Sequence, residues 1–490
     1  MESERRDVPR TVSGNGDRKF RFRVVVAITV LAAVIRFYKL GEWSFWNDES
    51  HTVDVAIHGI RSDAVGQSLY YPLNFLLTQL SFRLFGVSEF SARLFPCVFG
   101  ILTVPVTYRL GKTLSGWRTG LAAAFFLALS TWHIDWSQNA RYYAILGFLV
   151  TLSAVLLFEG FEQGKKWKLL AVHPILLLAV LSHPSGAFAG AAFVAYLILL
   201  YIFRVDKPDY FNKSILFYLS PYIVALIVFL PWYIRLPRML LELRGAVSSP
   251  IYLLMNLAYH INPVIIVLAA AALVLMLADR RREGVFLLCV ICVPILLLLA
   301  ASLKTLAYGV YVFYTLPAFY LLAADSLLGL YDIGGTSKKI LVHGVFAAVV
   351  LTLVSSTYLY FAYENGNRAK WREACMEVKE RMGGGDVVFA TEGTTAFYYL
   401  GNSPNVYWLS QFQDKYLSMQ NKTLWFIVYD EERTRESTRE FLRDRCRFIA
   451  EFSVHSSVKS RELRIYRHDP PGREASLRPG GSRPRETVPG

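Results

Sequence analysis

Long apolar runs constrain the fold of this chain more than any other feature of its sequence. A helix needs roughly 20 apolar residues to cross the ~30 Å hydrocarbon core of a membrane. Eleven segments come near that length, so the sequence predicts a polytopic α-helical membrane protein with eleven transmembrane helices. The segments are 24–40, 91–111, 119–134, 142–159, 168–182, 185–203, 214–234, 261–278, 285–302, 308–330 and 340–361.

The composition agrees with this fold class and argues against a nucleic-acid partner. Of the 490 residues, 54% are hydrophobic and 18% are charged, whereas about a quarter of the residues in a typical soluble domain are charged. The net charge is +14, but most basic residues lie in short loops between apolar segments and in the two tails. Positive charge at these places sets the orientation of the helices and contacts anionic lipid headgroups.

The distribution of loop charge predicts the topology, because cytoplasmic loops carry an excess of Lys and Arg. With the basic tail 1–23 in the cytoplasm, the inner loops hold the denser basic clusters, such as 280–282. The interrupted apolar segment 69–85 is either a twelfth span or an interfacial helix, and the loop charges favour the interfacial helix. We therefore expect a multi-pass protein of the plasma membrane with a long outer loop, 41–91, and its site on the extracytoplasmic face.

A second, smaller domain is expected after the transmembrane domain 24–361. Residues 365–467 contain a polar helix near Trp371, a charged helical stretch and several strand-like runs, which predict a small extracytoplasmic α/β domain. The final stretch, 468–490, is rich in Pro, Gly, Arg and Ser, so we expect it to be disordered. The strand-like runs are 386–390, 406–410, 425–429, 448–454 and 463–466.

The cysteines do not predict a disulfide scaffold. Cys289 and Cys292 lie inside an apolar run and are expected to be small buried hydrophobic residues. Cys375 and Cys446 fall in the polar C-terminal region, and they are candidates for a disulfide if that region faces an oxidising compartment.

The aromatic-rich stretch 43–51, just beyond the first span, carries the acidic pair Asp48 and Glu49. Adjacent side chains point in different directions on a regular backbone, so one can face a substrate while the other orients a neighbour. A carboxylate against apolar rings has its charged form disfavoured unless it is partnered, which is how a general base is tuned. The alternative is an interfacial turn with Trp anchors and solvated acids.

Several donors gather on the same predicted face. Arg141, His183 and Lys304 together suit a lipid-linked phosphate, although singly Arg141 and Lys304 can snorkel and His183 can cap a helix end. Arg36, near the end of the first span, either snorkels or forms a salt bridge that fixes the acidic pair. The candidate binding residues at this face are Arg36, Asp135, Gln138, Arg141, Tyr142, His183, Lys304 and Tyr311.

Short motifs along residues 24–330 resemble those of one enzyme family. They are 36–41 with 45–49, 70–73 with 84–87 and 91–94, 137–143, and 181–183. In order and predicted sidedness they are similar to the membrane glycosyltransferases of the GT-C fold, especially the protein O-mannosyltransferase and aminoarabinose-transferase-like group.

The resemblance implies roles for individual residues. Asp48 would be the general base that deprotonates an acceptor hydroxyl or amine, with Glu49 supporting it or holding the acceptor. Arg141, His183 and Lys304 would bind the phosphate of a polyprenyl-phosphate sugar, and one-step attack on the anomeric carbon would invert its configuration. The acceptor is a glycan, a lipid or a protein, and no metal or other cofactor is expected.

The sequence departs from the family pattern in two places. The family often has an Arg before a Leu-Pro pair, but 311–317 contains none, so Lys304 or a tyrosine would substitute. The residue before Pro72 is Tyr71, where the family usually has His or Lys.

Two other classes compete with a transferase: a transporter or flippase of a lipid-linked or polar substrate, and a non-catalytic assembly component. Transporters tend to place ionisable residues near the bilayer midplane and to contain internal repeats. Here such residues concentrate at the outer ends of the spans, and the acidic pair that an inactive relative is expected to lose is present. The sequence therefore favours the enzyme.

Overall fold

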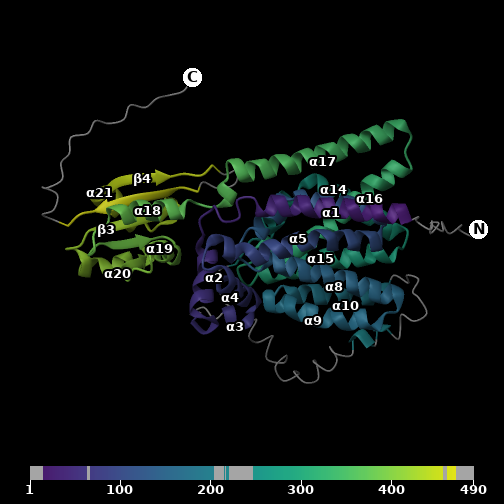
Figure 1. Ribbon diagram of the computed structural model, residues 1–490, viewed down its shortest axis with the longest axis horizontal. Coiled ribbons are helices and arrows are strands. Elements are labelled where there is room, and N and C mark those ends of the chain that lie inside the picture. The colour runs from purple at the N-terminus through teal and green to yellow at the C-terminus, as the bar shows by residue number, and fades with distance from the viewer. Residues whose placement is uncertain are drawn as a thin grey trace, which may run out of the picture. The chain divides into compact units, whose positions relative to one another are not determined.

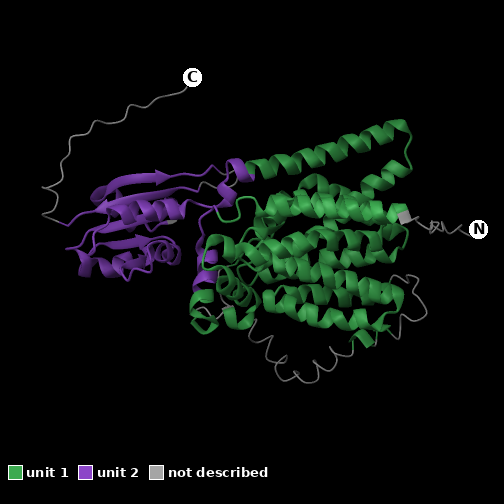
Figure 2. Cartoon of the chain, viewed as in Figure 1, with its two compact units in different colours: residues 1–41, 55–359 green, residues 42–54, 360–490 purple. Residues whose placement is uncertain are grey.

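The computed structural model describes residues 15–62, 67–202, 214–215, 217–219, 247–455 and 461–470. The chain divides into two compact units (Figure 2). Unit 1 comprises Met1–Gly41 and Val55–Leu359, and unit 2 comprises Glu42–Asp54 and Tyr360–Gly490. The stretch with the acidic pair, which the sequence analysis assigned to the outer loop of the membrane domain, therefore belongs to unit 2.

Unit 1 is a bundle of helices (Figure 1). Its long helices are α1 (Asn15–Phe37), α5 (Glu89–Leu114), α6 (Trp117–Leu129), α8 (Tyr143–Gln163), α9 (Lys166–Ser182), α10 (Gly186–Ile202), α14 (Pro263–Ala278), α15 (Arg282–Ser302), α16 (Leu316–Asp332) and α17 (Thr336–Ala362). Shorter elements are α2 (Asn47–His58), η1 (Ile60–Ser62), α3 (Gln67–Tyr70), α4 (Leu73–Phe85), α7 (Thr131–Ser137), α13 (Pro250–Ile261) and η2 (Gly309–Thr315); α2 begins in unit 2.

The protein is an integral, multi-pass membrane protein. Among the described residues, five helical segments are long and apolar enough to cross a membrane, and α13 with α14 forms a sixth candidate that is bent by 95°. Helices α6 and α10 are apolar but shorter. The predicted span 214–234 lies mostly outside the described residues, so the total of eleven spans stays a prediction.

Local sequence signals explain where predicted spans are interrupted. The bend between α13 and α14 falls at Asn262, which has a positive φ of 83° and whose side chain accepts a hydrogen bond from the backbone N–H of Val264. Pro263 follows, and a residue before proline is disfavoured in the helical region. The predicted span 119–134 ends early as α6, because Ser130 leaves the helical conformation and caps α7 through the N–H of His133.

A buried carboxylate ties three helices together inside the bundle. Glu159 of α8 accepts two hydrogen bonds from Arg109 of α5, at 2.9 and 2.8 Å, and one from Thr113 at 3.1 Å. Lys168 of α9 also donates to it. A buried charge is costly unless it is paired and fully hydrogen-bonded, and here the paired charges also fix the register of α5, α8 and α9.

Two glycines allow α5 and α6 to pack backbone against backbone. A Cβ on Gly111 would lie 2.6 Å from Cα of Gly120, and a Cβ on Gly120 would lie 2.5 Å from the carbonyl oxygen of Tyr108. Small residues at such contacts are typical of membrane helices, whose association depends on close packing rather than on expulsion of water.

We expect Gly120→Ala to destabilise the bundle by about 1–3 kcal/mol, because the added methyl meets backbone atoms that cannot move without separating the helices. Gly190→Ala in α10 is the matched control, since a Cβ there would meet nothing within 4 Å. Thermal unfolding of the purified proteins in detergent checks this, and equal melting temperatures for the two variants would contradict the packing argument.

Unit 2 contains a five-stranded sheet in the order β2-β1-β3-β5-β4. Strand β1 pairs in parallel with β2 and β3, and β5 pairs antiparallel with β3 and β4. The strands are β1 (Val387–Ala390), β2 (Val406–Trp408), β3 (Leu424–Tyr429), β4 (Arg447–Phe452) and β5 (Leu463–His468). The helices are α18 (Trp371–Arg381), α19 (Gly393–Tyr399), α20 (Phe412–Tyr416) and α21 (Glu436–Arg445).

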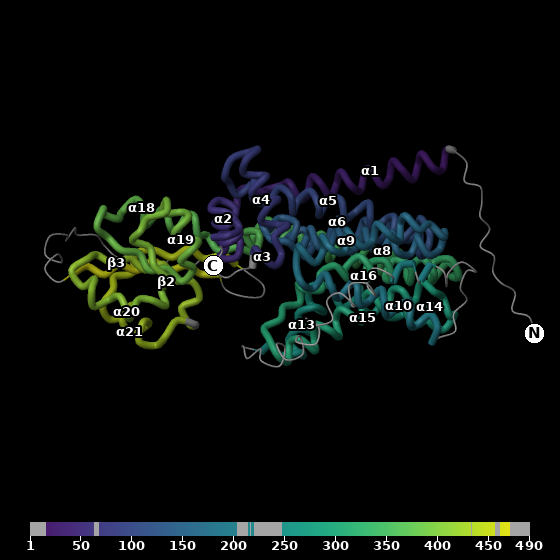
Figure 3. Tube along the Cα trace, turned by 90° about the horizontal axis from the view of Figure 1, so that it is seen from below, coloured from purple at the N-terminus to yellow at the C-terminus, as the bar shows by residue number. Residues whose placement is uncertain are grey.

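Helices cover both faces of this sheet, with α18 and α19 on one face and α20 and α21 on the other (Figure 3). Successive side chains of a strand point to opposite faces, so Val388 packs in the cluster of Trp371 while Phe389 packs in that of Phe412. Cys375 belongs to the first cluster and Cys446 packs against the second, and both are free thiols. The disulfide considered for these cysteines is therefore absent, because the sheet separates them.

Candidate functional site

The acidic stretch of unit 2 is held against α19 by hydrogen bonds and ring contacts. The backbone N–H of Phe45 donates to the hydroxyl of Tyr399 at 2.8 Å, and the hydroxyl of Ser50 donates to that of Thr395 at 2.9 Å. The ring of Phe45 also lies 5.3 Å from that of Tyr398. These contacts fix the start of α2, where Asp48 and Glu49 occupy the first turn. Unpaired N–H groups and the helix dipole stabilise negative charge at such a position.

The two acids have different environments. Glu49 is fully buried and accepts a hydrogen bond of 3.1 Å from Nε of Arg368, which is also buried. The Arg368 guanidinium donates to the carbonyl of Gly366 as well and lies 5.8 Å from the centre of the Trp43 ring. Asp48 is only half-buried. As their adjacency predicted, the two side chains have different surroundings. Glu49 is buried and hydrogen-bonded inside unit 2, and Asp48 is the more accessible carboxylate.

A third carboxylate, Glu392, joins this group. It lies between β1 and α19, accepts a hydrogen bond from the backbone N–H of Asn47, and receives another from the hydroxyl of Thr395 at 3.3 Å. Burial raises the pKa of Glu392 to about 7, and the nearby charge of Asp48 acts in the same direction while Arg461 opposes it. Near neutral pH, Glu392 can therefore hold or release a proton beside the start of α2.

The pKa of Glu392 makes the stability of the protein depend on pH. Its ordinary pKa is 4.5, so the folded state keeps a proton that the unfolded state loses between about pH 4.5 and 7. Stability is highest below this range and declines as the pH rises through it, by up to about 3 kcal/mol. We expect Glu392→Gln to remove this decline.

Melting temperature measured from pH 4.5 to 8 in wild type and Glu392→Gln checks the expectation. The exposed Glu380→Gln in α18 is the control and should follow the wild-type curve. If Glu392→Gln also follows the wild-type curve, the carboxyl does not titrate in this range.

Unit 1 brings a second group of predicted residues together, which we call the tyrosine–histidine cluster: Tyr71, Tyr142, Tyr143, His183 and Tyr311. The His183 ring stacks on that of Tyr142 at 4.8 Å between centroids and lies 4.6 Å from that of Tyr311. Tyr71 and Tyr143 lie 5.8 and 5.7 Å from His183. The residues come from the α3–α4 junction, the start of α8, the α9–α10 loop and η2.

Arg141 adds a cation to the tyrosine–histidine cluster. Its Nη2 donates to the hydroxyl of Tyr142 at 2.9 Å, and the guanidinium lies 4.6 Å from the centre of the same ring. Arg141 is 4% exposed, so the charge sits where water screens it weakly. An anion would therefore be attracted strongly to this position.

The hydrogen bonds of His183 define its tautomer. Nδ1 accepts from the backbone N–H of Ser185 at 3.2 Å and lies 2.8 Å from the Ser185 hydroxyl. The hydroxyl of Tyr314 donates to the carbonyl of Ser185 at 2.9 Å and holds this loop in place. Because Nδ1 must carry a lone pair, the neutral ring has its proton on Nε2, which is then a hydrogen-bond donor.

Two of the predicted binding residues form hydrogen bonds to the ends of helices. The fully buried Arg36 donates to the carbonyls of Ala128 and Leu127 at 3.0 and 3.1 Å, and its Nη2 lies 2.9 Å from Nδ1 of His133. Gln138, also fully buried, donates to the carbonyls of Arg36 and Tyr38. These bonds satisfy the last carbonyls of α6 and α1, so both residues are helix caps. Arg36 is thus buried and does not snorkel, whereas the substrate-binding role predicted for Arg36 and Gln138 stays a prediction.

Two other predicted residues, Lys304 and Asp135, are not part of the tyrosine–histidine cluster as defined. Lys304 is exposed after α15. Asp135 is half-buried in α7. We therefore keep Arg141, Tyr142, His183 and Tyr311 as the bundle's candidate site, with Asp48 and Glu49 in unit 2.

Glu392, Ser185, Tyr71 and Tyr143 belong to these two groups but were not among the residues predicted from the sequence. An acidic residue two positions after a buried strand was a usable signal for Glu392, since side chains at such strand ends commonly line sites. Tyr71 and Tyr143 lie within the motifs 70–73 and 137–143 but were not predicted to bind a substrate. Nothing local in the sequence indicated that Tyr71 and Tyr143 would meet His183.

Comparison with known sequences supports the resemblance. Residues 71–234 match the family model described as dolichyl-phosphate-mannose-protein mannosyltransferase. An uncharacterised protein of Aquifex aeolicus is 30% identical over 190 residues, which are 36% of this chain and 37% of that protein. Dolichyl-phosphooligosaccharide-protein glycotransferase 2 of Pyrococcus horikoshii is 29% identical over 170 residues, which are 31% of this chain and 22% of that protein. The matches thus span well under half the length of these relatives.

Comparison with solved structures shows the fold. ArnT from Cupriavidus metallidurans in the apo state superimposes with a TM-score of 0.58 and 13% identity, over 90% of this chain and 97% of that one. The oligosaccharyltransferase AglB from Archaeoglobus fulgidus, in complex with an inhibitory peptide and a dolichol-phosphate, gives a TM-score of 0.60 and 11% identity, over 85% and 70%. Both are GT-C glycosyltransferases, so the expected GT-C fold is confirmed.

Proposed function

We propose that this chain is an inverting glycosyltransferase that moves a sugar from a polyprenyl-phosphate donor to a glycan, lipid or protein acceptor. The main support is a GT-C fold combined with a divided acidic pair, in which Glu49 is locked by Arg368 and Asp48 stays accessible. Lipid-phosphate donors are supported by the relatives, since ArnT has also been solved bound to undecaprenyl phosphate and AglB with a dolichol-phosphate.

In the proposed reaction Asp48 accepts the proton of the acceptor hydroxyl or amine. The acceptor atom forms a bond to the anomeric carbon while the bond from that carbon to the phosphate oxygen breaks. The bonding electron pair leaves with the phosphate, and attack from the opposite side inverts the configuration. Glu49 positions the start of α2 and does not itself need to touch a substrate.

Arg141 is the proposed phosphate ligand. As the leaving phosphate gains negative charge, a buried cation stabilises it more strongly than an exposed one would. The neutral His183 can donate a hydrogen bond from Nε2 to a phosphate oxygen, and the tyrosine hydroxyls of the cluster are further donors. We propose no role for a metal ion in this step.

The finer topology belongs to the same proposal. We place the protein in the plasma membrane with eleven spans, a cytoplasmic tail 1–23 and the acidic pair on the extracytoplasmic side. Residues 365–467 would then be an extracytoplasmic domain, and the disorder expected for 468–490 falls almost entirely outside the described residues. The distribution of basic residues among the loops is the support for this arrangement.

The central test is transfer of labelled sugar from polyprenyl-phosphate donors in membranes that carry wild type or Asp48→Asn. We expect the variant to lose about 10²–10⁴-fold in rate, because it removes the proton acceptor but keeps the shape of the side chain. Asp54→Asn, the same change further along α2, is the control and should retain activity. Equal transfer rates for wild type and Asp48→Asn would contradict the role of Asp48 as the general base.

Arg141→Ala tests the phosphate site. Loss of a charge-assisted hydrogen bond should weaken donor binding by roughly 10–100-fold. Arg83→Ala, which removes an exposed arginine of α4, should leave binding unchanged. Affinity is measured by titrating the purified variants with polyprenyl phosphate; unchanged affinity in Arg141→Ala would exclude this role.

A further inference from the structure

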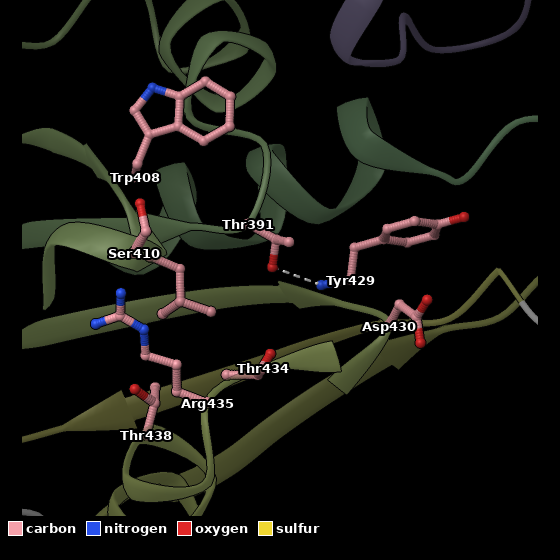
Figure 4. Close-up of a pocket in the computed structure, with 9 residues that line it drawn as sticks. Thr391, Trp408, Ser410, Tyr429, Asp430, Thr434, Arg435 and Thr438 are labelled. Carbon is pink, nitrogen blue, oxygen red and sulfur yellow. Dashed lines mark hydrogen bonds between the residues drawn. The ribbon is translucent and has the colours of Figure 1, made fainter. Parts of the chain in front are cut away.

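Unit 2 has a pocket of about 420 Å³ at the carboxyl ends of its three parallel strands. Thr391 follows β1, Trp408 ends β2, and Tyr429 ends β3. The start of α21 closes the pocket through Thr434, Arg435 and Thr438 (Figure 4). Open parallel sheets bind ligands at this edge, and the volume lies within the roughly 300–1,000 Å³ of small-molecule sites.

An exposed tryptophan, Trp408, lines one side of the pocket. Trp408 is 38% exposed, although a large apolar ring on a sheet is normally covered. Its indole packs on Gly393, where a Cβ would lie 2.9 Å from the ring, and its backbone N–H donates to Oε1 of Gln411 at 3.2 Å. The absence of a side chain at position 393 thus lets the ring lie against α19 and stay accessible from the pocket.

The polar groups around the pocket include both donors and acceptors. Ser410, Thr434 and Arg435 contribute hydroxyls and a guanidinium, and Asp430 lines the pocket on the side away from Trp408 and Arg435 (Figure 4). Asp430 adopts a left-handed conformation, with φ of 56°, directly after β3. One acid and one base balance each other, so the pocket suits a neutral ligand with many hydroxyl groups better than an anion.

An aromatic face combined with paired donors and acceptors matches one chemical class. Sugar rings present apolar C–H faces, which pack on an indole, and a rim of hydroxyls that both donate and accept hydrogen bonds. A nucleotide is the other ligand that is common at this sheet edge. The turn after β1 runs Thr391-Glu392-Gly393 and lacks the glycine-rich pattern that holds a phosphate at this edge.

The pocket shares a turn with the acidic stretch. Thr391 lines the pocket, and the next residue, Glu392, accepts the backbone N–H of Asn47 beside Asp48. Gly393, against which Trp408 packs, begins α19, the helix that holds Phe45 and Ser50. The pocket and the proposed base are therefore positioned by the same turn and helix within unit 2.

We propose that this pocket binds a saccharide of the acceptor, which would make the acceptor a glycan. The assignment of the ligand to the acceptor rests on the proposed function; saccharide binding as such does not. Trp408 is the stacking platform, and Ser410 and Arg435 on the same side of the pocket are the hydrogen-bonding groups.

The experiment is saturation-transfer difference NMR of the full chain in lipid nanodiscs, which avoid detergents with sugar headgroups. The probes are mannobiose, cellobiose and lactose, with sorbitol as an acyclic control and AMP as a nucleotide. We expect at least one disaccharide to bind while sorbitol and AMP do not. Trp408→Ala should weaken that binding at least tenfold, whereas Phe448→Ala, which removes an exposed aromatic of β4, should not.

A second variant keeps the test decisive if Trp408→Ala fails to fold. Ser410→Trp adds bulk at an exposed position that lines the pocket and should also block binding. The proposal is overturned if wild type binds none of the disaccharides, if AMP binds in their place, or if a folded Trp408→Ala or Ser410→Trp binds as wild type does. If the protein transfers sugar but binds no saccharide, only the assignment of this pocket is wrong. If it binds a saccharide but transfers sugar from none of the donors, the proposed transferase function is wrong.

Discussion

The bundle depends on satisfying helix ends where water cannot reach. Carbonyl groups at the end of a helix have no partner within it, and each unsatisfied one costs free energy in an apolar interior. Arg36 supplies donors to the end of α6, and Gln138 supplies them to the end of α1. These reciprocal caps join α1 to the α6–α7 break, and so they fix the segment that leads into Arg141 and the tyrosine–histidine cluster.

The carboxylates of unit 2 show how environment separates residues of the same chemical type. Glu49 is buried and paired with Arg368, Glu392 is buried and has a raised pKa, and Asp48 is half-buried at a helix start. Burial with a cation keeps a carboxylate charged and immobile, whereas burial without a close cation favours its protonated form. The three carboxylates therefore differ in burial and hydrogen bonding, although all lie at the start of α2 or in the turn before α19.

Several features were predictable because their causes are local. Apolar length predicted the helices of the bundle, and the Asn-Pro pair at 262–263 explains a bend that a hydropathy pattern alone did not predict. The adjacency of Asp48 and Glu49 predicted that they would face different partners. The partners of Arg36 and Gln138 were not predictable in this way, because they are backbone carbonyls about 90 to 100 residues away in sequence.

The sequence by itself determined a membrane-embedded helical chain with a terminal α/β region, because the length and period of apolar runs depend only on neighbouring residues. It also determined the family resemblance through short motifs. Tertiary structure decided which polar residues cap helices and which gather around His183, and it assigned 42–54 to unit 2. It also placed Glu392 beside the acidic pair, because such contacts join residues far apart in the chain and depend on packing rather than on local pattern.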